Sequence, residues 1–164
     1  GGQSGPTDAG RAQAIAEIVP YGENDTLCYR AEEGEALYHR QLAVWEPLLA
    51  AAEQRWDIRF ERVCGIVHKP QPAATLARMA TVLAAESDFS LAGLRNLASL
   101  AASLVIALAA IVPGADAATL WNAANLEEDW QAELWGKDAE ALARRERRFA
   151  AFLAAVRFAE LARG

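Results

Sequence analysis

The sequence has little of what a metal site or a nucleophilic enzyme needs. It contains only two cysteines, Cys28 and Cys64, and two histidines, His39 and His68. The cysteines form no C-x-x-C pair, and neither histidine lies in an H-E-x-x-H motif or at zinc spacing from a cysteine. Glu35 and His39 share a helix face at i, i+4, but two side chains do not complete a metal site. We therefore expect no metal, no cofactor and no enzymatic activity.

Positive charge and long apolar runs are also scarce. The 164 residues carry 16 Lys and Arg against 22 Asp and Glu, a net charge of −6. Nucleic-acid binding needs concentrated positive charge, and the basic run Arg144–Arg148 lacks interleaved aromatic residues for base stacking. The most apolar stretch, Leu97–Val112, would span about 24 Å as a helix, less than a hydrocarbon core of about 30 Å. We expect neither nucleic-acid binding nor membrane insertion.

The β-branched strand formers are few as well. The chain has 38 Ala and 19 Leu against 8 Val and 6 Ile, a composition that favours helices. We expect a mainly α fold, a single helical-bundle domain around a central apolar helix at Leu97–Val112. At most a short β hairpin is expected in Ile58–Val67, with Leu27–Arg30 as its candidate partner. Two isolated cysteines are typical of reduced thiols inside a cell.

Prolines, glycines and capping residues divide the rest of the chain into helices. The expected helices are Gly10–Val19, ended by Pro20 and Gly22; Glu35–Trp56, kinked or split by Pro47; Ala73–Ala85, opened by Pro72; the central helix, capped by Ser90 and stopped by Pro113; Ala117–Trp135, capped by Asp116 and ended by Gly136; and Asp138–Ala162. Residues 1–10 are interpreted as a linker or as residues added by cloning, and residues 11–164 as the folded domain.

The segment Leu120–Gly136 carries the most unusual pattern. Drawn as one helix, it has a polar arc and a broad apolar arc, and Glu127, Glu128 and Gln131 fall within the apolar arc. A buried carboxylate must be paired, protonated or placed at an opening. Two explanations stay open at this point: an internal pair with an arginine such as Arg95, or contact with a binding partner. Tryptophan anchors both cores and interfaces, and for the tryptophans of this segment core packing is the favoured interpretation.

This segment resembles the signature of a known family. Leu126-Glu127-Glu128, Gln131 and Trp135-Gly136 are similar to the assembly chaperone that binds the alpha subunit of the catalytic head of F-type ATP synthase. Further segments agree with that family in order and spacing: Leu27-Cys28-Tyr29-Arg30, Trp45-Glu46-Pro47-Leu48-Leu49, Gly65-Ile66 with Gln71-Pro72, and Ser103-Leu104-Val105. The resemblance runs from about Arg11 to Ala159.

The resemblance implies a function without a chemical step. It implies an ATP-independent chaperone that binds the unassembled alpha subunit and prevents its aggregation before assembly with beta subunits. The client-binding residues that it implies are Glu127, Glu128, Trp130, Gln131, Trp135 and Gly136. It also implies that the chain corresponds to the family's carboxy-terminal helical domain, without the amino-terminal β-rich domain.

The sequence also leads to expectations about oligomeric state, cellular location and alternative functions. We expect a monomer in the cytoplasm of an alphaproteobacterium, or in the mitochondrial matrix if the source is eukaryotic. The main alternative is a generic helical protein-interaction module with no preference for the alpha subunit. A helical-bundle enzyme using Glu35, Glu127 and Glu128 as metal ligands is disfavoured, because no histidine stands at Glu-x-x-His spacing.

Overall fold

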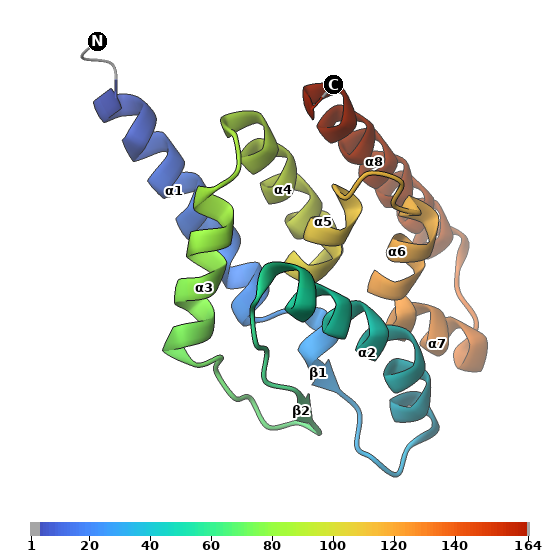
Figure 1. Cartoon of the computed structure of the whole chain (residues 1–164). Coiled ribbons are helices and arrows are strands. Elements are labelled where there is room, and N and C mark those ends of the chain that lie inside the picture. The colour runs from blue at the N-terminus through green and yellow to red at the C-terminus, as the bar shows by residue number, and fades with distance from the viewer. Residues whose placement is uncertain (1–3, 164) are drawn as a thin grey trace.

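Helices account for most of residues 4–163, the part of the chain that this computed structural model describes. In chain order the elements are α1 (Ser4–Glu23), a 3-10 turn (Thr26–Cys28), β1 (Tyr29–Arg30), α2 (Ala36–Trp56), β2 (Val63–Cys64), α3 (Ala73–Ala84), α4 (Asp88–Ala101), α5 (Leu104–Ala110), α6 (Ala117–Ala124), α7 (Leu126–Trp135) and α8 (Ala139–Arg163). Figure 1 shows α4 and α5 at the centre, flanked by α1 and α3 on one side and by α6 and α8 on the other. The predicted mainly α fold is confirmed.

The apolar stretch at the centre is buried as predicted, but it is not one helix. Leu97, Leu104 and Leu108 are at most 1% exposed. The helix that contains Leu97 starts at Asp88, with Ser87 rather than Ser90 as its cap, and it ends at Ala101. After it, Ala102 adopts a left-handed conformation with φ of 52°.

Contacts from a distant part of the chain hold this break between α4 and α5. The Ser103 Oγ accepts a hydrogen bond from Ile106 N at 3.0 Å and starts α5. The buried Asp25 Oδ2 accepts another from Val105 N at 2.9 Å. The Ala102 carbonyl accepts two bonds from Thr26, one from its amide at 3.1 Å and one from its hydroxyl at 2.8 Å. The break is therefore a tertiary feature, which explains why no local pattern in an alanine-rich sequence predicts it.

The two short strands pair in parallel, so the predicted hairpin is wrong. Tyr29 stands opposite Val63, and Arg30 stands opposite Cys64. The predicted partner segment is thus correct. The direction differs because α2 lies between the strands in sequence, and a long crossover of this kind brings the second strand back in the same direction.

The first two helices run through their prolines. The predicted helix Gly10–Val19 is too short, since α1 extends over Ser4–Glu23 with Pro20 inside it. Gly22 lies in this extension, and a Cβ there would be 2.5 Å from the Met79 Sδ, so the glycine permits close contact between α1 and α3. The next helix, α2, likewise continues through Pro47 and is not split. Residues 1–3 of the predicted linker lie outside the described part.

The predicted helix Ala117–Trp135 is divided into two. Asp116 caps its start, as expected, by accepting a hydrogen bond from Thr119 N at 3.1 Å. Gly136 ends it with φ of 82°, also as expected. Between these points α6 stops at Ala124, and α7 begins at Leu126 after Asn125. The final helix agrees with the prediction and occupies Ala139–Arg163.

Candidate functional site

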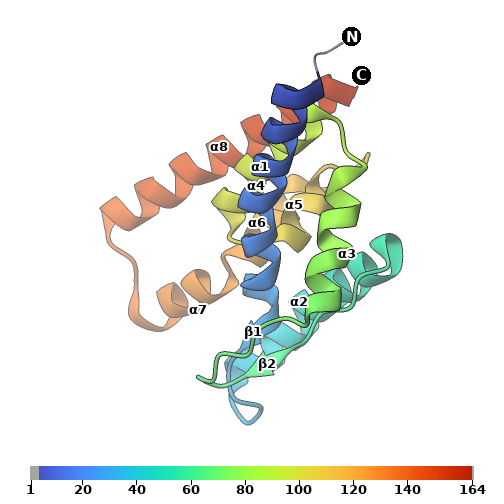
Figure 2. The same ribbon diagram turned by 90° about the vertical axis from the view of Figure 1, so that its left-hand side faces the viewer.

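The residues that the sequence singled out lie on and around α7, which is attached to the molecule largely by polar contacts. Leu126 is its one buried residue. The helix lies at the edge of the molecule, away from the α4 and α5 core (Figure 2). Asn125 produces the turn before it, because the Asn125 Nδ2 donates to the Trp121 carbonyl at 2.9 Å and closes the last turn of α6. The helical wheel drawn for one continuous helix therefore does not describe α7.

Three of the four carboxylates on α7 already have a cationic partner. The pairs are Glu128 with Lys137 at 3.6 Å, Asp129 with Arg145 at 2.6 Å, and Glu133 with Arg40 at 3.9 Å. The Arg145 pair is bidentate, since its Nε also donates to Asp129 at 2.8 Å. Arg95, the candidate internal partner for the carboxylates of this segment, instead pairs with Glu17 at 2.7 Å. The proposed pairing with Arg95 is therefore wrong, and Glu128 instead pairs within the chain with a lysine.

Glu127 differs from its neighbours on α7. Its Oε1 accepts a hydrogen bond from the Nε2 of Gln41 at 2.8 Å. Gln41 is fully buried on α2, and its own Oε1 accepts from Ala31 N at 2.9 Å, so its orientation is fixed. Among residues 8–162, whose side chains the structure describes, no cation lies in ion-pair range of Glu127. Partial burial raises the pKa of Glu127, against the opposing effect of the Gln41 hydrogen bond.

The three tryptophans of the segment have different environments. Trp121 is fully buried and packs on Phe152, with ring centroids 5.0 Å apart. Trp130 is half-buried beneath the guanidinium of Arg40, 5.2 Å from the ring centroid. Trp135 is 80% exposed at the end of α7. Trp135 alone of the three is therefore available to a partner without rearrangement.

The remaining candidate residues also lie at the surface. Gln131 and Gly136 are exposed, and the backbone of Gly136 ends α7 just after Trp135. Leu134 is 56% exposed beside Trp135. The sequence analysis did not single out Leu134, because a single helix drawn over Leu120–Gly136 places this residue on the apolar arc. The exposed end of α7 thus combines apolar and polar groups within one turn.

Two of the segments that resemble the family, one on β1 and one on α2, are in contact with each other. Arg30 of β1, with a side chain only 3% exposed, donates to Glu46 at 2.6 Å. Arg62 also donates to Glu46, at 2.6 Å. The hydrogen bonds from Arg62 and Arg30 lower the pKa of Glu46 to about 2. Trp45 connects α2 to α6, because its Nε1 donates a hydrogen bond to the Ala123 carbonyl at 2.7 Å. These contacts fix the helix that carries Gln41, a role that no sequence pattern had indicated.

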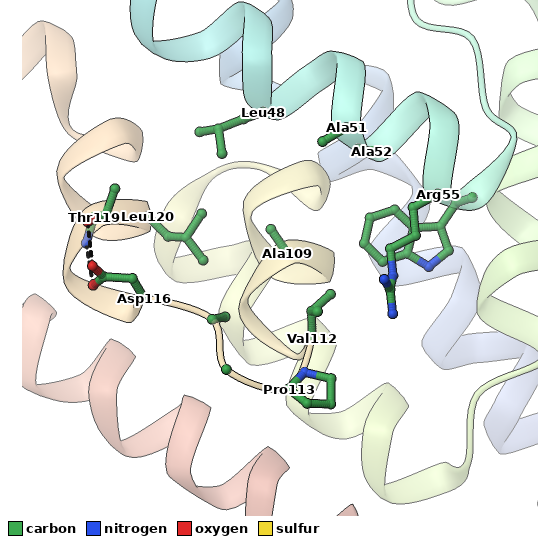
Figure 3. Close-up of a pocket in the computed structure, with 13 residues that line it drawn as sticks. Leu48, Ala51, Ala52, Arg55, Ala109, Val112, Pro113, Asp116, Thr119 and Leu120 are labelled. Carbon is green, nitrogen blue, oxygen red and sulfur yellow. Dashed lines mark hydrogen bonds between the residues drawn. The ribbon is translucent and has the colours of Figure 1, made fainter.

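An apolar groove lies at the other end of α2 (Figure 3). It has a volume of about 440 Å³ and is lined mainly by apolar residues of α2 and of the connection between α5 and α6, with α6 completing it. Arg55 and Asp116 are the charged residues in its lining. Asp116 already accepts two hydrogen bonds from Thr119, at 3.1 and 2.8 Å. The groove therefore offers shape but few polar groups that could orient a small molecule.

The described residues contain neither a cluster of metal ligands nor a helix that could span a membrane. Among residues 4–163 no three His, Cys, Asp or Glu side chains gather closely enough to hold a metal ion. His39, which shares a helix face with Glu35 in the sequence pattern, is exposed on α2. No helix in the same range is both long and apolar enough to cross a membrane.

This chain is similar to a known protein family and to proteins of solved structure. A family model described as ATP12 chaperone protein matches residues 4–53. The crystal structure of Atp12 from Paracoccus denitrificans superposes with a TM-score of 0.86 and 32% identity, over 98% of this chain and 67% of that protein. The chain belongs to the ATP12 chaperone family.

A second solved structure is similar over most of this chain and is longer than it. A protein from Agrobacterium tumefaciens, described as a putative chaperone, is 36% identical, with a TM-score of 0.82 over 92% of this chain. The chain spans 56% of the Agrobacterium protein. Both of these matched proteins therefore have a portion that this chain does not cover.

Proposed function

We propose that this chain is an ATP-independent assembly chaperone that binds the unassembled alpha subunit of F-type ATP synthase. Membership of the ATP12 family supports the general class of function. The alpha subunit as the client follows from the resemblance of the α7 residues to the family signature. In this proposal the protein has no chemical step: it covers an aggregation-prone surface of the client until beta subunits take its place.

The observation that carries the proposal is the environment of Glu127. It is the one carboxylate on α7 that faces a neutral amide, Gln41, rather than a cation of the described chain. A partly desolvated carboxylate with a free oxygen gains strongly from a cation that arrives with a partner. We propose that Glu127 pairs with a lysine or arginine of the client. Glu128 has a structural role in this proposal, because it already pairs with Lys137.

The exposed end of α7 supplies the apolar part of the proposed contact. Trp135 and Leu134 are 80% and 56% exposed, and Gln131 is exposed one turn earlier. Large aromatic side chains in such positions commonly carry much of the binding energy at protein interfaces. In this arrangement Trp130 supports α7 through Arg40 rather than touching the client. The proposed client-binding residues are therefore Glu127, Gln131, Leu134 and Trp135, with Gly136 setting the end of the helix.

Light scattering of unfolded alpha subunit diluted into buffer tests this function. We expect the chain at equimolar concentration, without nucleotide, to suppress alpha-subunit aggregation. The beta subunit, diluted in the same way, is the matched client control and should aggregate as it does alone. Equal protection of both subunits would instead indicate a generic interaction module. No protection of the alpha subunit would contradict the proposal.

A further inference from the structure

The loop after β2 presents two apolar side chains at the surface of the described chain. Ile66 has a relative exposure of 102%, and its neighbour Val67 is 67% exposed. We call these two residues the apolar tip. Single exposed apolar residues are common on protein surfaces. A pair of adjacent β-branched residues held clear of the protein is less easily explained by packing.

The apolar tip is held in place on both sides. Before it, Gly65 has φ of 83° and donates from its amide to the Arg30 carbonyl at 2.8 Å. After it, the His68 ring stacks on Tyr29 with centroids 5.6 Å apart, and the Tyr29 hydroxyl donates to the Lys69 carbonyl at 3.0 Å. A loop ordered in this way loses little conformational entropy when it binds, so an apolar group on it is pre-organised for a partner.

Negative charge flanks the apolar tip. The β1–α2 connection, residues 31–35, contains three exposed glutamates, Glu32, Glu33 and Glu35, and we call it the acidic loop. A Cβ on Gly65 would lie 2.5 Å from Glu32 Oε1, so the Glu32 carboxylate packs directly on the base of the tip. None of the three glutamates has an ion-pair partner among the described side chains of residues 8–162.

The acidic loop is joined to the α7 site by one side chain. The buried amide of Gln41 donates to Glu127 at 2.8 Å and accepts from the amide of Ala31, the first residue of the acidic loop, at 2.9 Å. Figures 1 and 2 agree in placing α7, the β1–α2 loop and the loop after β2 at the same end of the molecule. The acidic loop thus adjoins the base of the apolar tip at Gly65 and is linked to Glu127 through Gln41, and we call these three parts together the edge.

We infer that this edge is a second contact region for the client, with the apolar tip entering an apolar depression bordered by lysine or arginine. The inference rests on the proposed chaperone function and extends it from α7 to the loop after β2. The stated chemistry follows from charge complementarity, since four carboxylates on this edge lack a cation in the described chain. Burial of an Ile and a Val side chain in the partner supplies affinity, whereas the glutamates supply orientation and a faster encounter.

Binding of the alpha subunit to the 164-residue chain and its variants tests the inference. We expect the double variant Ile66→Ser with Val67→Ser to weaken the affinity at least about tenfold while the melting temperature stays unchanged. The matched control is Phe89→Ser, since Phe89 is 64% exposed and α4 begins at the opposite end of the molecule (Figure 1). This control should bind as the wild type does. A further variant, Glu32→Lys with Glu33→Lys, should slow association about 3- to 10-fold at low salt, with less effect at high salt.

The outcomes separate this inference from the proposed function. If the wild type binds the alpha subunit and the tip variant binds equally well, the second contact region is wrong and the α7 proposal stands. If the wild type does not bind the alpha subunit, the proposed function fails and the inference fails with it. A tip variant that changes only self-association in sedimentation would assign the tip to contact between copies of this chain, and would also overturn the inference.

Discussion

Arg30 and Glu46 form an ion pair that joins β1 to α2, with 2.6 Å between the Arg30 Nη1 and the Glu46 Oε1. Both residues belong to segments that resemble the family pattern, and they lie 16 positions apart in sequence. The Arg30 side chain is buried, so its charge depends on Glu46 for compensation. This pair orients α2, which carries Gln41. Because Gln41 donates a hydrogen bond to Glu127, the pair also affects the position of the Glu127 carboxylate.

Removing the charge of Glu46 should destabilise the fold. We expect Glu46→Gln to lower the free energy of unfolding by about 1–3 kcal/mol, because it leaves the buried Arg30 guanidinium without an anion. The loss is smaller than for a fully buried pair, since the Glu46 side chain is 35% exposed. The pKa of Glu46 falls to about 2 on folding, from an ordinary value of 4.5. Its contribution is therefore present above about pH 4.5 and is lost as the pH falls toward 2. Urea unfolding at pH 7 and pH 3 should show a smaller difference between wild type and variant at pH 3.

Asp25 should produce the opposite pH dependence. Burial raises its pKa from 3.8 to about 6, against hydrogen bonds from the start of α5. A carboxyl with a raised pKa stabilises the fold at low pH, and that contribution is lost as the pH rises from about 4 to about 6. Relative to Asp25→Asn, the wild type should therefore lose unfolding free energy over this range, by roughly 2 kcal/mol. Parallel stability curves for the two proteins between pH 4 and pH 6 would contradict the assignment.

The break between α4 and α5 places Leu104 at the centre of the core, where it is fully buried. We expect Leu104→Ala to cost about 2–5 kcal/mol of unfolding free energy, because it leaves a cavity in close-packed surroundings. Leu161→Ala is the matched control, since Leu161 is 75% exposed on α8. Chemical denaturation of both variants measures the difference. A loss at Leu104 no larger than at Leu161 would place Leu104 outside the core.

The helical class and most helix ends could be predicted from the sequence because they depend on local chemistry. Asp116 and Gly136 act through their own caps, and the apolar content of Leu97–Val112 is reflected in its burial. The break at Ala102 could not be predicted in this way. It depends on Asp25 and Thr26, more than 70 positions away, and no local signal marks it.

The sequence indicated candidate residues but not how they are arranged. The sequence pointed to Glu127 and Glu128 together and gave no means of separating them. Their partners decide the difference: Gln41 is 86 positions before Glu127, whereas Lys137 lies just beyond the helix that carries Glu128. The break at Asn125 also separates α7 from α6, so a wheel drawn for one continuous helix did not predict the exposure of Leu134. Contacts of this range require the folded structure.

The affinity of Glu127→Gln for the alpha subunit, measured beside Glu128→Gln, tests the central claim most directly. Both variants are isosteric, and the amide oxygen that replaces the carboxylate in Glu127→Gln could still accept the Gln41 hydrogen bond. The unfolding free energy of this variant should therefore stay within about 1 kcal/mol of wild type. We expect Glu127→Gln to weaken binding at least about tenfold, because the client cation loses its charged partner, and Glu128→Gln to change it less than about threefold. Binding of Glu127→Gln at wild-type affinity, with its fold intact, would contradict the account.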